Sequence, residues 1–300
     1  MSMEPSAKIQ IQRINREDVR PVQLGGAAGK DKRPIRGSDL FPEIYANIFF
    51  CARKKSGKTQ AILHTIKKCA TIETHVVAFV STLNNDPTWR TIQEMCKEMK
   101  VQFTGHTSMK DPDTGADILD DIVRGLQNHP FTSEEKDENE QVLKAAAASG
   151  VKVGIVEDKQ GKKPKRPKEK APRIIFIFDD LSNEIKRPSL TALVKKNRQF
   201  QSKVIIASQY WNDLDLQARK QMDYVLIWPG QHSKLEEIHR NLELTVSLPL
   251  FNDLYSFCTM KPYHFMWIDV VNSEFRKDFT HKLGIPQQLA QDPVPDDRDS

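Results

Sequence analysis

The residues with the clearest chemical potential lie in the sequence ARKKSGKT, residues 52–59, where Gly57, Lys58 and Thr59 match the phosphate-binding pattern G-x-x-x-x-G-K-[ST]. In that pattern, backbone N–H groups and the positive end of the next helix face the phosphates. The lysine ammonium contacts the β and γ phosphates, and the threonine hydroxyl binds Mg²⁺. We therefore predict a loop for a nucleoside triphosphate and Mg²⁺, formed by Ala52, Arg53, Lys54, Lys55, Ser56, Gly57, Lys58, Thr59 and Gln60.

One residue departs from this pattern, because Ala52 stands where the first glycine is expected. The change adds a single methyl group at the loop entrance and requires only that residue 52 have a negative φ angle. An apolar run precedes the loop and a helical pattern follows it, so we expect the loop to form. The alternative is a chance match at the start of a lysine-rich helix.

A second acidic motif follows the apolar run IIFIF, residues 174–178, which ends in Asp179 and Asp180. A strand of this kind delivers its first carboxylate to Mg²⁺ and its second to the attacking water. Neighbouring residues at a strand end point in different directions, so the two aspartates can have separate roles. The alternative is that they only cap the next helix. The presence of both motifs in this order favours catalysis.

Three more polar residues surround the next apolar run, residues 203–208. Gln209 ends that run, so we expect its amide beside the two aspartates, where it would sense the γ-phosphate and orient water. An ordinary turn is the alternative. Arg198 precedes the run and Arg219 follows it, and either is a candidate arginine finger for the γ-phosphate of a neighbouring subunit. The sequence leaves open which arginine acts, or whether both are solvated.

The elements that must position these residues alternate along the chain. We expect strands at residues 45–51, 75–81, 173–178, 203–208, 223–228 and 264–270, and helices at 59–70, 89–99, 116–127, 188–200 and 233–242. This alternation predicts an α/β fold with a mostly parallel central sheet and helices on both faces. About 120 residues separate Thr59 from Asp179. That spacing favours the RecA-like, additional-strand class of P-loop NTPases, and the absence of N-K-x-D favours ATP over GTP.

Composition bounds the remaining possibilities. With 300 residues, 38% of them hydrophobic, the chain can bury an ordinary core, and no apolar run approaches the ~20 residues of a membrane span. We expect an intracellular protein without a membrane partner. Its four cysteines lack metal-ligand spacing and are expected to be buried thiols. We predict a basic tail at residues 1–40, an ATPase domain at 41–275 with a charged insertion at 131–172, and a C-terminal tail at 276–300.

The insertion contains a strongly basic run at residues 162–170, in which six lysines and arginines accompany one acid, Glu169. Basic side chains at this density suit contacts with DNA phosphates. A solvated loop and a nuclear-localisation signal are the alternatives. The net charge of +5 permits a polyanionic partner without requiring one.

The succession SGKT, IIFIFDDLS, NRQFQSKVIIASQ, ARKQMDYVLIW and HFMWIDV resembles the DNA-packaging ATPases of large double-stranded DNA viruses and virophages, within the FtsK/HerA superfamily. The resemblance covers about Tyr45 to Val270. It implies a homo-oligomeric ring that hydrolyses ATP with Mg²⁺, translocates double-stranded DNA and packages a genome into a preformed capsid. It also implies a capsid or portal vertex protein as partner. The expected location is the host cytoplasm or nucleus at sites of virion assembly, or the virion.

Two other functions fit the same residues. One is a different nucleic-acid motor of the superfamily, such as a conjugation or segregation pump or a helicase. The other belongs to a different class: a nucleotide-gated assembly protein that binds ATP and organises partners with negligible turnover.

Overall fold

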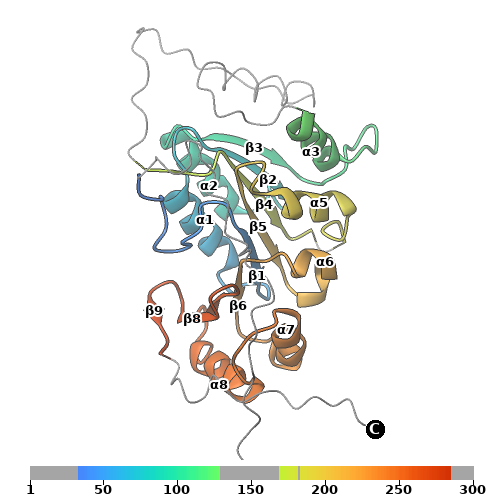
Figure 1. The fold of residues 1–300 in the computed structure, drawn as a ribbon. Coiled ribbons are helices and arrows are strands. Elements are labelled where there is room, and N and C mark those ends of the chain that lie inside the picture. Colours follow the sequence, from blue (N-terminus) through green and yellow to red (C-terminus); the bar gives the residue numbers. More distant parts are fainter. Residues whose placement is uncertain (1–32, 129–168, 182, 285–300) are drawn as a thin grey trace, which may run out of the picture. The chain divides into compact units, whose positions relative to one another are not determined.

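The computed structural model describes residues 33–128, 169–181 and 183–284 (Figure 1). Their strands form one nine-stranded sheet in the order β3-β2-β4-β5-β1-β6-β7-β8-β9. The strands are β1 (Asn47–Cys51), β2 (His75–Val80), β3 (Gln102–His106), β4 (Ile174–Asp179), β5 (Ser202–Ser208), β6 (Tyr224–Ile227), β7 (Met266–Asp269), β8 (Glu274–Lys277) and β9 (His281–Lys282).

The first six strands pair in parallel, whereas β7, β8 and β9 pair antiparallel. Parallel strands end at the same edge of a sheet, so the segments after β1, β4, β5 and β6 meet there. Strand β5 lies between β1 and β4, with Cys51 opposite Ser208 and Asp179 opposite Ala207. The strand that carries the phosphate-loop motif is therefore separated by one strand from the strand that carries the two aspartates. This arrangement confirms the predicted additional-strand class.

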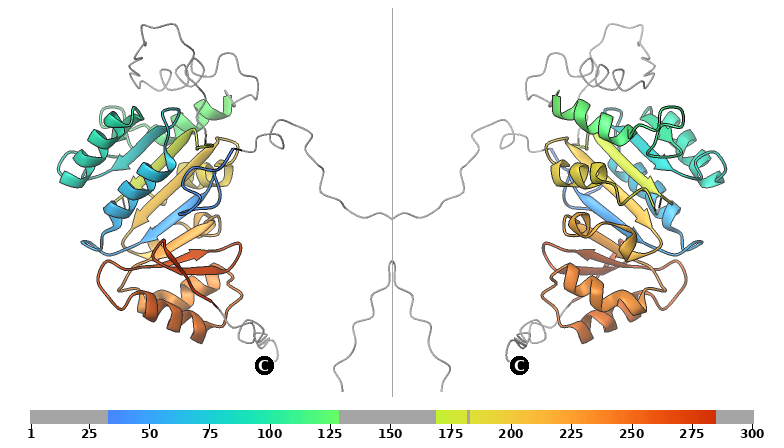
Figure 2. Two further views of the ribbon diagram at one scale, coloured as in Figure 1. Left: turned by 90° about the vertical axis from the view of Figure 1, so that its left-hand side faces the viewer. Right: turned by 90° about the vertical axis from the view of Figure 1, so that its right-hand side faces the viewer.

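Helices cover both faces of the sheet, as the two side views in Figure 2 show. Side chains alternate along each strand, so Ile48 and Phe50 face one core and Phe49 and Cys51 face the other. The first core also contains buried side chains from α1 (Lys58–Cys69) and α2 (Pro87–Glu98). The second contains side chains from α3 (Ile118–Asn128), α5 (Pro188–Lys196), α6 (Leu216–Arg219), α7 (Leu235–Asn241) and α8 (Leu248–Cys258).

Most expected elements are present, with several differences. The strands β3, β8 and β9 and the helices α6 and α8 were not expected, and the expected strand at 264–270 runs antiparallel to β6. The four tryptophans and four cysteines are buried in the two cores. In the described part of the chain, none of the helices has the length and apolar character needed to cross a membrane.

The packed domain can be compared with the predicted domain boundaries at both of its ends. Residues 1–32 of the predicted tail and residues 131–168 of the predicted insertion lie outside the described residues. Leu40, assigned to the tail, is buried against α1 and its neighbours, and β8 and β9 continue past residue 275. The packed domain thus includes residues on either side of the 41–275 range.

Candidate nucleotide-binding and hydrolysis site

The loop between β1 and α1 has the backbone that the motif requires. Gly57 precedes the helix with φ 92°, and Lys55 has φ 61°, so both lie in the left-handed region. Ala52 has a negative φ, is fully buried, and donates its N–H to Ser208 O at 2.9 Å. The alanine therefore continues the pairing of β1 with β5 without strain. Burial raises the pKa of the neighbouring Cys51 thiol, which stays protonated.

The loop and the end of β4 are joined by an ion pair. Lys58 Nζ lies 2.7 Å from Asp179 Oδ1, and the two side chains are only 12% and 4% exposed. Trp89 Nε1 on α2 donates to the other oxygen, Asp179 Oδ2, at 3.3 Å. The two motifs recognised in the sequence are thus brought into direct contact through a largely buried pair of opposite charges.

A cleft of about 510 Å³ opens beside this ion pair. That volume lies in the usual range for small-molecule sites. The cleft is lined by residues 53–60 of the loop together with Thr82, Asn85, Asp86, Thr88, Asp179 and Asp180. The four residues between 82 and 88 were not predicted. They follow β2, which pairs with β4, so the polar sequence after that strand was the available signal.

Asp180 is held at the carboxyl edge by contacts from two neighbouring strands. It has φ 57°, and its carbonyl accepts from Ser81 Oγ at 2.8 Å. Gln209 Nε2 approaches Asp180 Oδ1 at 3.4 Å, a long hydrogen bond. Strand β5 therefore places the glutamine amide beside the second aspartate, in the position expected from the sequence.

Gln231 is a further member of this polar edge that the sequence did not reveal. Its side chain donates from Nε2 to Gln209 O at 2.8 Å, and the residue is 2% exposed. Tyr255 OH accepts from Gln231 N at 3.0 Å and donates to Trp228 O at 3.0 Å. Burial raises the pKa of Tyr255, so the phenol remains a neutral donor. These contacts fix the segment after β6 against the end of β5.

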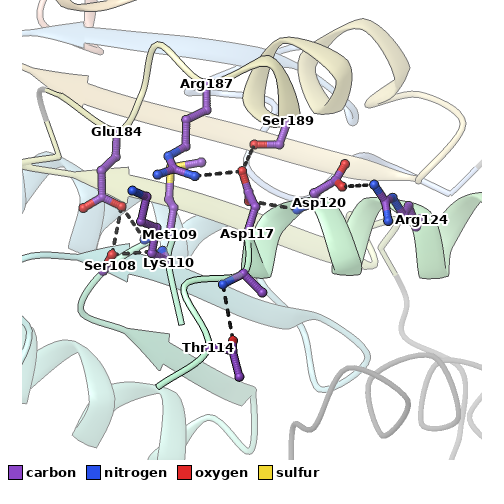
Figure 3. A network of polar contacts seen from close by, with 11 residues as sticks. Ser108, Met109, Lys110, Thr114, Asp117, Asp120, Arg124, Glu184, Arg187 and Ser189 are labelled. Atoms are coloured by element: carbon purple, nitrogen blue, oxygen red, sulfur yellow. Dashed lines mark hydrogen bonds and ion pairs between the residues drawn. The ribbon is translucent and has the colours of Figure 1, made fainter. Parts of the chain in front are cut away.

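The segment that follows Asp180 is anchored by the polar network in Figure 3. Glu184 accepts from Ser108 Oγ at 3.0 Å and from Met109 N at 2.5 Å. Asp117, next to the start of α3, accepts from Arg187 Nη1 at 3.1 Å and Ser189 Oγ at 2.9 Å. The backbone after the two aspartates is thereby tied to the loop between β3 and α3.

The two candidate arginines occupy different surroundings. Arg198 lies between α5 and β5, at the opposite edge from the phosphate loop; its side chain is 68% exposed and lies 3.8 Å from Asp223. Arg219 is only 11% exposed. Its Nη1 donates to Asn212, Glu237 and Asn241 at 2.9–3.0 Å. Neither arginine lines the cleft of its own chain.

The donor set fits Mg²⁺. Asp179 Oδ1 is buried and accepts no hydrogen bond, and it forms an ion pair with the Lys58 ammonium. A carboxylate and the Thr59 hydroxyl are hard oxygen ligands of the kind that Mg²⁺ prefers. Ser56 Oγ is also buried without a partner, at the phosphate loop. Among the described residues, no three His, Cys, Asp or Glu side chains form a metal cluster, so other Mg²⁺ ligands would come from phosphate or water.

Together, the strand order and the loop geometry define a P-loop fold of the additional-strand class. Solved structures with a similar fold include the genome packaging NTPase B204 from Sulfolobus turreted icosahedral virus 2 in complex with ATP-gammaS. It is 16% identical, has a TM-score of 0.42, and is matched over 80% of this chain and 99% of that chain. The DNA-packaging ATPase B204 from Sulfolobus turreted icosahedral virus is 15% identical, with a TM-score of 0.46 over 78% and 96% of the two chains.

A third similar structure is the cytoplasmic domain of the Thermomonospora curvata type VII secretion ATPase EccC. It is 12% identical with a TM-score of 0.47, and the match covers 80% of this chain but 26% of that chain. No protein-family model and no curated protein sequence matches this chain. At these identities and scores the likenesses concern the fold and do not carry an argument about function.

Proposed function

We propose that the chain is an ATP-hydrolysing motor that translocates double-stranded DNA. The observation that carries the ATPase part is the Lys58–Asp179 ion pair at 2.7 Å, because it unites both motifs at one cleft. A lysine and a carboxylate that are both almost buried need partners of opposite charge. A triphosphate offers the lysine such a partner, and Mg²⁺ offers one to the carboxylate.

In the proposed reaction, the backbone N–H groups of the loop and the Lys58 ammonium hold the triphosphate, and the Thr59 hydroxyl and Asp179 hold the metal. When bound, Mg²⁺ would neutralise charge on the β and γ phosphates. Asp180 polarises the attacking water, and Gln209, already 3.4 Å from that carboxylate, orients it and senses the γ-phosphate. A change at the γ-phosphate would reach β5 through this glutamine.

The arginine that completes the site is proposed to come from a neighbouring subunit of a homo-oligomeric ring. Arg198 suits this role better than Arg219, because its guanidinium is exposed whereas that of Arg219 is engaged by three side chains of its own chain. The separation of Arg198 from its own cleft is compatible with action in trans only. Mixing wild-type subunits with Arg198→Ala subunits tests this proposal, since each variant neighbour should silence one wild-type site.

The DNA substrate and the packaging role rest on the sequence resemblance, above all on the block NRQFQSKVIIASQ, residues 197–209. With that resemblance, the ring would pump a viral genome into a preformed capsid and would contact a capsid or portal vertex protein. The proposed place of action is the host cytoplasm or nucleus at sites of virion assembly, or the virion itself. Electron microscopy with duplex DNA and a non-hydrolysable ATP analogue would show whether a ring encloses DNA.

The catalytic assignment predicts the behaviour of Asp180→Asn. Asparagine keeps an oxygen acceptor for Gln209 but cannot take a proton, so ATP binding should persist while turnover falls at least ~100-fold. Nucleotide titration and steady-state phosphate release measure the two effects. Asp113→Asn, in an exposed turn, is the matched control and should retain normal turnover. Undiminished hydrolysis in Asp180→Asn would refute the assignment.

Two rival functions remain to be separated by experiment. A helicase of the same superfamily would release a labelled strand from a forked duplex, whereas a double-strand translocase would displace a bound roadblock without separating the strands. A nucleotide-gated assembly protein would bind ATP yet show negligible turnover under all conditions.

A further inference from the structure

Tyr263 is an exposed aromatic residue in an unusual backbone conformation close to the phosphate loop. It lies in the segment between α8 and β7, is 70% exposed and has φ 69°. A bulky side chain in the left-handed region is uncommon, and such strain persists only where the surroundings over-determine it. An exposed aromatic side chain held in a strained backbone conformation indicates a functional role at this position.

The segment around Tyr263 is fixed on its far side. His264 Nδ1 lies 2.6 Å from Asp278 Oδ2, and Phe265 N donates to Asp278 Oδ1 at 3.0 Å. The buried Phe265 ring packs on Trp228, with ring centroids 4.5 Å apart. Tyr263 is therefore presented from an anchored stretch of backbone rather than from a free loop tip.

Sheet pairing places Tyr263 at the edge that carries the phosphate loop. Met266 of β7 pairs with Ile227 of β6, and Ile227 pairs with Cys51 at the end of β1. The contact is direct: a β-carbon placed on Gly57 would lie 3.5 Å from Tyr263 Cδ1 and 4.0 Å from its Cβ. The tyrosine thus stands against the loop on the β6 side.

The two ends of a bound nucleotide must lie on opposite flanks of this loop. Asp179 and Asp180 stand on the β5 and β4 side of β1, so the γ-phosphate and its metal belong there. With the γ-phosphate there, the nucleoside at the other end of the triphosphate would extend across the loop toward β6 and β7. That flank is where Tyr263 presents its ring, and aromatic faces stack on nucleobases.

We propose that Tyr263 is the stacking platform for the adenine base of the nucleotide bound at the phosphate loop. This proposal rests on the proposed nucleotide-binding function and adds the subsite that holds the base. Because every base has a π-face, the platform contributes affinity for the nucleoside without choosing sharply between adenine and guanine.

The test compares a ligand with a base and a ligand without one. Calorimetric titration with a non-hydrolysable ATP analogue and with tripolyphosphate, both with Mg²⁺, is carried out on wild type, Tyr263→Ala, Tyr263→Phe and Met260→Ala. The last variant is the control, because Met260 is 73% exposed in the same segment. Tyr263→Ala should weaken the analogue at least about fivefold and leave tripolyphosphate unchanged. Phenylalanine should restore the affinity, and Met260→Ala should behave as wild type.

Equal loss of both ligands, or no loss of the analogue, in Tyr263→Ala would overturn the platform while leaving nucleotide binding in place. Failure of the wild type to bind either ligand would overturn the proposed function as well, so the two failures are distinct. Should the alanine variant unfold, Tyr263→Trp decides: its added emission should change with the analogue but not with tripolyphosphate. An identical response to both ligands would contradict stacking.

Discussion

At the scale of single residues, the phosphate loop accepts alanine at position 52 because the backbone conformation at that position does not require glycine. Ala52 keeps a negative φ and the hydrogen bond to Ser208, whereas Gly57 carries the left-handed φ that a side chain would strain. The two glycine positions of the pattern are therefore unequal in this chain. Glycine is required at position 57 because of the left-handed dihedral angles there, and it is not required at position 52.

Restoring the consensus with Ala52→Gly should accordingly leave nucleotide affinity unchanged. The variant should lower the free energy of unfolding by about 1 kcal/mol, because glycine has more backbone freedom to lose and the buried methyl group is removed. Nucleotide titration and denaturant unfolding measure the two quantities. An affinity gain of about tenfold would contradict this view of the loop, since it would show that Ala52 strains the bound state.

At the scale of elements, the strands and the polar loops position the site in different ways. The parallel strands bring the ends of β1, β4 and β5 to one edge, and side-chain networks then fix the segments that leave that edge. The network of Figure 3 is the clearest case, since Asp117 joins the start of α3 to the segment that follows Asp180. The segment that follows Asp180 is therefore held by contacts between residues 70 or more positions apart in the chain.

Asp117→Ala tests how much this joint stabilises the fold. The change removes the acceptor for Arg187, Ser189 and the backbone N–H of Asp120, and should cost about 2 kcal/mol of unfolding free energy. Arg124→Ala, which removes an exposed i,i+4 ion pair of the same network, should cost less than about 0.5 kcal/mol. Denaturant unfolding of both variants measures the difference. Equal losses would show that the joint is not structural.

The pairing of β2 and β3 predicts a dependence on pH. Burial, followed by repulsion from His106, lowers the pKa of His75 to about 4, and the ring contacts Thr104 Oγ1 at 2.8 Å. A histidine with a lowered folded pKa gives stability that is complete above pH 6.5 and is lost as the pH falls toward 4. The expected loss is about 3 kcal/mol. It is read from unfolding free energies of wild type and His75→Gln, and parallel pH curves would contradict it.

Much of this fold could be predicted from short apolar runs, because a buried parallel strand must be apolar on both faces. β3 was not predicted because it is an edge strand with a partly exposed, polar sequence, QFTGH. Within the site, the phosphate loop and the two aspartates could be predicted, because each motif consists of residues that are adjacent or close in the sequence. The positions of Gln231 beside Gln209 and of Tyr263 beside Gly57 could not be predicted, because they depend on pairings of β6 and β7 that the sequence alone does not specify.

At the scale of the whole molecule, the described domain brings the phosphate loop, Asp179 and Asp180 to one cleft, but neither candidate arginine finger, Arg198 or Arg219, lines that cleft. That arrangement fits an enzyme whose sites are completed by neighbouring subunits. Residues 162–168 of the basic run 162–170 lie outside the described residues, and the contact of this run with DNA stays a prediction. If the assembled protein is a DNA motor, its ATP hydrolysis must be coupled to DNA.

The most direct test of that coupling is steady-state ATP hydrolysis by the full chain, measured with and without duplex DNA in the presence of Mg²⁺. We expect turnover to rise when duplex DNA is added and to fall again with increasing salt, because phosphate contacts release counterions. Asp180→Asn provides the inactive baseline. Negligible turnover in both conditions, despite measurable ATP binding, would contradict the motor and favour a nucleotide-gated assembly protein.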